Sequence, residues 1–197
     1  MNFTDINDLI KKRRSVFPPS YNDKEIPKHI IEHILENANY APTHKLTEPW
    51  RFKILRANSD KSGGAPLQRL AAFLVEDYIQ HTSIELRSEI KLKKMAENPL
   101  RSNCVIAICM QRHEALLPEW EEIAAVSAAV QNMWLTCTAY GIGSYWSSPG
   151  AIDRIGDFLN LNEGEKCLGF FYMGYTDEPL LVGKRGAIED KCVWIEE

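Results

Sequence analysis

Residues 40–50 read YAPTHKLTEPW, and they interrupt a helical pattern with a turn that is rich in hydrogen-bond donors and aromatic rings. Pro42 and Pro49 cannot continue the preceding helix, because proline lacks a backbone N–H. Hydrophobic segments flank the turn, so its polar side chains are held at fixed places near a core. We interpret the turn as a ligand-binding loop between a helix and a strand.

The segments around this loop predict a mixture of helices and strands. Apolar residues repeat at helical spacing over 30–38, whereas they alternate with basic residues over 50–54. Further helices are predicted near residues 5–15, 67–78, 84–97, 119–140 and 152–159, and further strands at 104–110, 145–146, 168–172 and 193–195. Because helices and strands do not alternate regularly, we expect an α+β fold.

Four segments carry expectations about assembly and access. The continuous apolar run at 104–110 is typical of a central strand that is covered on both faces. The helix at 119–140 has so little polar surface in its middle that it must be covered on more than one side, as a dimer interface would do. The charged helix at 84–97 is expected at the periphery or in a lid over a cleft. Beyond residue 178 we expect an extended arm that ends in a strand.

Composition indicates one ordinary globular domain over residues 1–197, with 45% apolar and 25% charged residues. No apolar run approaches the roughly 20 residues of a membrane-spanning helix, and no hydrophobic signal region opens the chain, so we expect a cytoplasmic protein with no membrane partner. The net charge of −4 argues against a nucleic-acid partner, because such binding depends on a basic face. The five cysteines are widely spaced, which predicts buried free thiols and no metal site.

Three segments hold residues with binding chemistry. Arg13-Arg14-Ser15 closes the first helix, Tyr40 and His44 belong to the loop at 40–50, and Gly143-Ser144-Tyr145-Trp146-Ser147-Ser148 follows the long helix. On its own, a basic pair at a helix end is more often compensation of the helix dipole. Taken together, the three segments resemble the flavin-binding constellation of the nitroreductase family, from about residue 4 to the C-terminus. The loop is similar to the Ala-Pro-x-His-Lys…Pro-Trp pattern of one subgroup of that family.

The resemblance implies that these segments bind flavin mononucleotide (FMN), with cations suited to its phosphate. The implied cofactor-binding residues are Arg13, Arg14, Ser15, Tyr40, His44, Trp146, Ser147, Ser148, Lys184 and Arg185. Tyr40 and His44 are expected to reach the flavin of the partner subunit. Tyr40 and Ser147 stand where the subgroup pattern has arginine, so two cations of that pattern are missing. Lys184 and Arg185 stand where many family members place basic residues near the phosphate, and they are placed to offset the loss.

The implied fold is nitroreductase-like α+β, with a central, mostly antiparallel sheet flanked by helices, an extended C-terminal arm and a homodimeric assembly. The implied activity is FMN-dependent hydride transfer from NADH or NADPH to a small acceptor such as a nitroaromatic or quinone, by a ping-pong mechanism. The flavin carries the chemistry and no side chain is assigned a catalytic role, so the protein positions the reactants. No catalytic triad, metal motif or phosphate-binding glycine loop competes with this interpretation.

Two alternatives stay open. The same fold and flavin also support dehalogenation, flavin fragmentation or ring oxidation in relatives, and the substrate loops decide between these reactions. The other alternative is a non-enzymatic dimeric interaction module, whose basic pairs contact an anionic partner. A purified protein that stays colourless with added FMN would favour that module.

Overall fold

The structure, a computed structural model, describes residues 3–56, 65–178 and 183–196. Within these ranges the elements follow the order α1 (Phe3–Lys12), α2 (Lys28–Asn39), β1 (Trp50–Arg56), α3 (Ala65–His81), α4 (Glu89–Arg101), β2 (Cys104–Gln111), α5 (Glu119–Ala139), β3 (Ile142–Ser147), α6 (Gly156–Leu159) and β4 (Glu165–Tyr175). The short 3-10 turns are η1 (Pro18–Ser20), η2 (His44–Leu46), η3 (Ile84–Leu86), η4 (Gly150–Arg154) and η5 (Glu189–Lys191).

The four strands form one antiparallel sheet in the order β1-β2-β4-β3. The apolar run at 104–110 lies in β2, in the middle of this sheet, and each of its residues is completely buried. The prediction of a central strand covered on both faces is therefore confirmed. The register between β2 and β4 shifts between Ile108 and Cys109, beside Gly169, whose φ is +139°.

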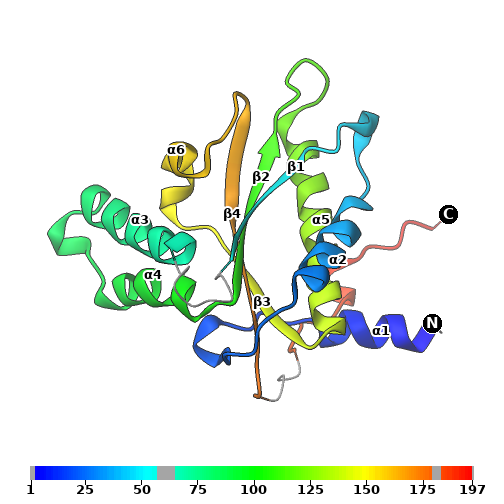
Figure 1. The fold of residues 1–197 in the computed structure, drawn as a ribbon. Helices are drawn as coiled ribbons and strands as arrows, with labels where there is room; N and C mark the ends of the chain where they lie inside the picture. The colour runs from blue at the N-terminus through cyan, green and yellow to red at the C-terminus, as the bar shows by residue number, and fades with distance from the viewer. Residues whose placement is uncertain (1–2, 57–64, 179–182, 197) are drawn as a thin grey trace.

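Helices cover both faces of the sheet (Figure 1). α2 and α5 pack on one face, where Ile34, Met133 and Phe171 belong to one buried core. α3, η4 and α6 pack on the other, where Leu74 and Phe170 belong to a second core. Successive residues of a strand point to opposite faces, so adjacent phenylalanines of β4 serve the two cores. No helix in the described part of the chain is long and apolar enough to cross a membrane.

Local chemistry sets where several helices begin and end. Pro27 and Pro118 stand directly before α2 and α5, where the missing N–H of proline breaks no intrahelical bond. The Ser88 hydroxyl accepts a hydrogen bond from the Lys91 N–H over 3.4 Å and caps α4. Gly141, with a φ of +69°, follows the end of α5.

Four expectations are corrected. The helix expected at 84–97 is divided into η3 and α4, and the helix expected at 152–159 is divided into η4 and α6. The strand expected at 193–195 was wrong, because those residues pair with no described strand and are 84–97% exposed. A short apolar run favours a strand only where a partner satisfies the backbone. Cys192 is exposed, whereas the other four cysteines are buried free thiols as predicted.

Candidate functional site

The end of α1 is joined to β3 by backbone pairing. Ser15 forms a parallel bridge with Ser144, and the Val16 N–H donates to the Ser144 carbonyl over 3.0 Å. The indole N–H of Trp134 lies 3.1 Å from the carbonyl oxygens of both Arg14 and Ser144. Two of the three predicted segments, the basic end of α1 and residues 143–148, therefore lie side by side.

Three arginines gather beside this junction. The Arg13 guanidinium lies 4.6 Å from the centroid of the Trp134 ring. Burial lowers the pKa of Arg13, and the positive charges of Arg185 and Arg14 lower it further. The Arg14 guanidinium packs so closely on Gly183 of the C-terminal arm that a Cβ there would overlap it. The residues predicted for the phosphate are thus brought together from both ends of the chain.

No described carboxylate neutralises this arginine cluster (Arg13, Arg14 and Arg185). In residues 3–56, 65–178 and 183–196, none of the three guanidinium groups forms an ion pair with a carboxylate. Ser15 is exposed beside them, and Lys184 is exposed next to Arg185, whose Nη1 donates to the Lys184 carbonyl over 2.8 Å. Neighbouring cations without acids are suited to an anion such as phosphate, which guanidinium binds by charge-assisted hydrogen bonds.

Side chains at the end of β3 point to opposite faces of the sheet. The Trp146 indole N–H donates to the Leu168 carbonyl over 3.2 Å, and its ring packs against the core beneath α2 and α5. Tyr145 points to the opposite face, where its ring stacks on Tyr172 at 5.0 Å. Ser147 and the adjoining Ser148 line a cavity on that second face. Of the three residues predicted here, the two serines reach open space and the tryptophan is half-buried.

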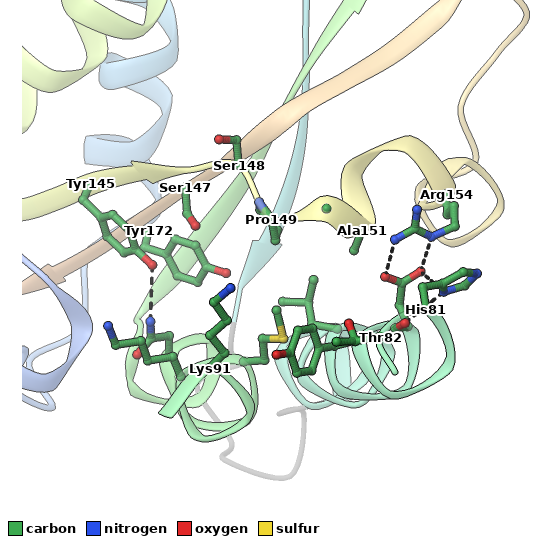
Figure 2. A pocket seen from close by; sticks show the side chains of 17 residues that line it. His81, Thr82, Lys91, Tyr145, Ser147, Ser148, Pro149, Ala151, Arg154 and Tyr172 are labelled. Carbon is green, nitrogen blue, oxygen red and sulfur yellow. Dashed lines mark hydrogen bonds and ion pairs between the residues drawn. The ribbon is translucent and has the colours of Figure 1, made fainter. Parts of the chain in front are cut away.

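The cavity has a volume of about 540 Å³ and lies between α3, α4 and the end of β3 (Figure 2). Asp77 and Arg154 face each other in its wall through two hydrogen bonds of 2.6 and 2.8 Å. These bonds to Arg154 are the main cause that lowers the pKa of Asp77, and the nearby His81 also contributes. A cavity of this size fits a small organic ligand. α4 lies within the charged segment 84–97 expected at the periphery or over a cleft, and it forms part of the wall of this cavity.

Tyr40 and His44 lie elsewhere in the subunit. Tyr40 is 80% exposed, and the His44 imidazole contacts the carboxylate of Glu121, in the first turn of α5, at 2.5 Å. Arg13 contacts the same helix 13 residues later, at Trp134, which corresponds to roughly 20 Å along the helix axis. One subunit therefore does not bring the loop together with the arginine cluster. The expectation that these two residues serve the partner subunit stays a prediction.

A buried charge network supports the loop before α5. The Glu122 side chain is completely buried, forms an ion pair with Arg112, and lies 2.6 Å from the His113 imidazole. Beyond it, the Lys45 ammonium donates to the Leu116 carbonyl over 3.0 Å, so the same loop holds the segment that carries His44. Sequence reasoning missed this network and also the lining of the cavity by α3 and α4. The only local signal was the helical spacing of polar and apolar residues on those helices.

The chain is similar to known proteins in both sequence and fold. The profile of the family described as "Nitroreductase family" matches residues 10–175. YfhC of Bacillus subtilis (strain 168), whose name proposes an NAD(P)H nitroreductase, is 28% identical over 188 residues, covering 94% of this chain and 92% of that protein. The crystal structure of a nitroreductase-like family protein from Bacillus cereus has a TM-score of 0.82 and 26% identity, covering 100% of this chain and 99% of that one. The FMN-dependent nitroreductase NfnB from Mycobacterium smegmatis, solved with NADPH, has a TM-score of 0.73 and 16% identity, covering 98% and 99%.

Proposed function

The chain belongs to the nitroreductase family, and from this we propose that it is an FMN-dependent oxidoreductase that transfers hydride from NADH or NADPH to a small acceptor. The observation that carries the proposal is the arginine cluster, whose three guanidinium groups meet beside β3 and pair with no described carboxylate. The donor set suits the phosphate of FMN, because planar guanidinium groups bind phosphate oxygens in pairs. FMN, when bound, supplies the hydride chemistry that this chain's side chains do not.

We assign the remaining roles to the residues around that cluster. Arg13, Arg14 and Arg185 would bind the phosphate, with the exposed Ser15 hydroxyl and Lys184 ammonium beside them. Trp146, through its backbone, and Ser147 and Ser148, through backbone and hydroxyl groups, would line the ring, because β3 starts where the cluster lies and ends at the cavity. In this proposal the chain acts as a single domain over residues 1–197 that binds and orients its reactants.

A homodimer is part of the proposal, because Tyr40 and His44 would complete the partner's site. Trp120 and Ile123 on α5 are 67% and 38% exposed, and the apolar side chains of the C-terminal arm are uncovered. Exposed apolar surface of this kind marks an interface between subunits. The same face of α5 carries small residues such as Ala124, which allow close approach of a second helix.

One cavity opens beside Ser147 and Ser148, and we propose that the nicotinamide donor and the acceptor enter it in turn. This arrangement gives a ping-pong mechanism, so double-reciprocal plots at several fixed acceptor concentrations should be parallel. Intersecting lines would require both substrates to be bound together and would contradict the shared position. The acceptor that we propose is a nitroaromatic or quinone.

The test of the proposed function is an absorbance spectrum of the purified protein. The protein should show the bands of oxidised flavin, either as isolated or after FMN is added and free FMN is removed. Anaerobic addition of NADH or NADPH should bleach those bands, and a quinone should restore them. A protein that retains no FMN after such loading would exclude the proposed function and favour the interaction module.

Arg13→Ala is expected to weaken FMN binding about tenfold, since a charge-assisted hydrogen bond to phosphate contributes roughly 1.5–3 kcal/mol and this site is partly open to water. Fluorescence titration of the apo protein with FMN measures the dissociation constant. Lys12→Ala is the matched control, because Lys12 is a neighbouring cation in the last turn of the same helix. The apo fold should lose only about 0.5–1 kcal/mol, the contribution of a guanidinium over an indole ring. Equal FMN affinity in the two variants would remove Arg13 from the phosphate site.

Trp120→Asp is expected to shift the protein from dimer towards monomer, because it places a charge in the proposed interface. Sedimentation velocity should give twice the 22.5 kDa chain mass for the parent and a concentration-dependent lower mass for the variant. Leu86→Asp is the control, since Leu86 is 76% exposed on η3, far along the chain from α5. A parent that sediments at the chain mass at every concentration would exclude the dimer.

A further inference from the structure

One face of α4 forms part of the cavity wall and carries two lysines. Lys91, Lys94, Met95 and Asn98 follow each other at helical spacing, and all four line the cavity. Figure 2 shows Lys91 extending from α4 towards the segment that holds Ser147. In the part of the chain that the structure describes, neither lysine ammonium has a hydrogen-bond or ion-pair partner.

The described lining of the cavity is electropositive, because its one acidic side chain is already neutralised. Among the described residues that line it, Asp77 is the only carboxylate, and Arg154 pairs with it at 2.6 and 2.8 Å. Lys91 and Lys94 therefore remain as uncompensated charges facing the open space. An anion that entered would gain two charge-assisted contacts and would meet no free carboxylate.

The rest of the wall is aromatic and apolar. The Tyr145 and Tyr172 rings stack at 5.0 Å with an interplanar angle of 17°, and Tyr78 of α3 and Met95 of α4 also line the cavity. The phenol oxygen of Tyr145 accepts a hydrogen bond from the Asn98 amide over 3.3 Å, which fixes its ring. Tyr145 lies between the rings of Phe17 and Tyr172, with centroids at 4.9 and 5.0 Å, so an aromatic ligand would meet ring edges and phenol groups, which suit edge-to-face contacts.

We propose that this cavity binds a small aromatic monoanion, with its carboxylate held by Lys91 and Lys94 and its ring beside the tyrosines. The inference rests on the proposed function, since the bound anion would be the acceptor and its reducible group would face Ser147 and Ser148. A second, smaller hollow of about 300 Å³ shares Lys94, Asn98, Tyr145 and Ser147 with the cavity and extends it towards η1. The ligand would therefore lie between the lysines of α4 and the segment assigned to the flavin.

The experiment compares 4-nitrobenzoate with 4-nitrobenzamide, which share shape and nitro group but differ by one charge. Isothermal calorimetry on the FMN-loaded protein, without nicotinamide, should give a dissociation constant at least tenfold lower for the acid than for the amide. A tenfold ratio of dissociation constants corresponds to one modest charged contact. In the variant Lys91→Gln/Lys94→Gln the preference for the acid should fall to about twofold or less. Lys93→Gln is the matched control, since Lys93 lies on the same helix outside the cavity and pairs with Glu97 at 3.9 Å.

Turnover supplies the second measurement. Two NADPH and two protons convert each nitro group to a hydroxylamine and water, so oxidation of NADPH reports the reaction. The double variant should raise the KM for 4-nitrobenzoate about tenfold and leave the KM for NADPH within twofold. A rise in the KM for NADPH instead would assign the lysines to the phosphates of the donor and would overturn the proposal.

Failure of this inference is distinguishable from failure of the proposed function. A parent that retains FMN and reduces the neutral acceptor 1,4-benzoquinone, but binds the acid no more tightly than the amide, would overturn the anion site alone. A parent that retains no FMN would overturn the proposed function, and calorimetry on that protein would still measure the preference for the anion. Equal loss of preference in the Lys93→Gln control would show a general effect of surface charge and would also overturn the site.

Discussion

Glu122→Ala is expected to lower the free energy of unfolding by about 3–5 kcal/mol, the typical cost of removing one partner from a buried ion pair. The Glu122 carboxylate is completely buried and pairs with Arg112, whose side chain is 8% exposed. It also accepts the backbone N–H of His113 over 3.3 Å. Without the carboxylate, a guanidinium and an N–H would stay buried without their partner. Urea unfolding followed by circular dichroism measures the change.

The neighbouring Glu121→Ala is the matched control, because Glu121 is only partly buried and contacts the exposed His44. It should cost under about 1 kcal/mol, as expected for surface ion pairs. The double variant Arg112→Met/Glu122→Leu should recover most of the loss, since buried ion pairs are often replaceable by apolar residues of similar volume. A loss below about 1 kcal/mol in Glu122→Ala would contradict the described network.

The network also links stability to the proposed site of the partner subunit. Arg112 donates to the Leu117 carbonyl over 3.4 Å, and Lys45 donates to the Leu116 carbonyl over 3.0 Å. The loop before α5 is therefore held from one side by the buried charges and in turn holds the segment that carries His44. In the Glu122→Ala variant, amide hydrogen exchange should accelerate more in residues 112–117 than in the sheet.

The elements that the sequence could predict are those with a strong local period. The apolar run at 104–110 forms the buried central strand. Ile34 and Ala38, which are spaced one helical turn apart, lie on the buried face of α2. Such patterns depend on neighbours within a few residues, so no tertiary information is needed. The strand expected at 193–195 is wrong for the converse reason, because a local apolar run cannot supply a hydrogen-bonding partner.

The meeting of distant segments could not be predicted from local patterns. Arg13 and Arg185 are more than 170 residues apart, and only the resemblance to a known family indicated that they approach each other. Lys91 and Lys94 look like an ordinary solvated helix face, because a lysine stripe has the same sequence whether it faces water or a cavity. Glu122 stands in an acidic first turn that suits the helix dipole, and nothing local marks it as buried.

Gly169→Ala is expected to destabilise the protein by about 3 kcal/mol or more and to weaken FMN binding at the same time. Gly169 has a φ of +139°, which residues with a side chain rarely adopt, and a Cβ there would lie within 3.0 Å of the Ser147 carbonyl oxygen and the Trp146 indole. Backbone strain costs roughly 1–3 kcal/mol and overpacking costs a similar amount. The clash pushes on the end of β3 that we assign to the flavin ring, so thermal unfolding and FMN titration should both change.

Gly156→Ala separates this close approach from the general effect of adding a methyl group. A Cβ at Gly156 would meet nothing within 4 Å, so this variant should be neutral or more stable by up to about 1 kcal/mol. If Gly169→Ala lowers stability but leaves FMN affinity equal to that of Gly156→Ala, the end of β3 is structural and does not contact the cofactor. If both properties fall in Gly169→Ala alone, the contact of Gly169 with Trp146 and Ser147 shapes the binding surface as well as the sheet.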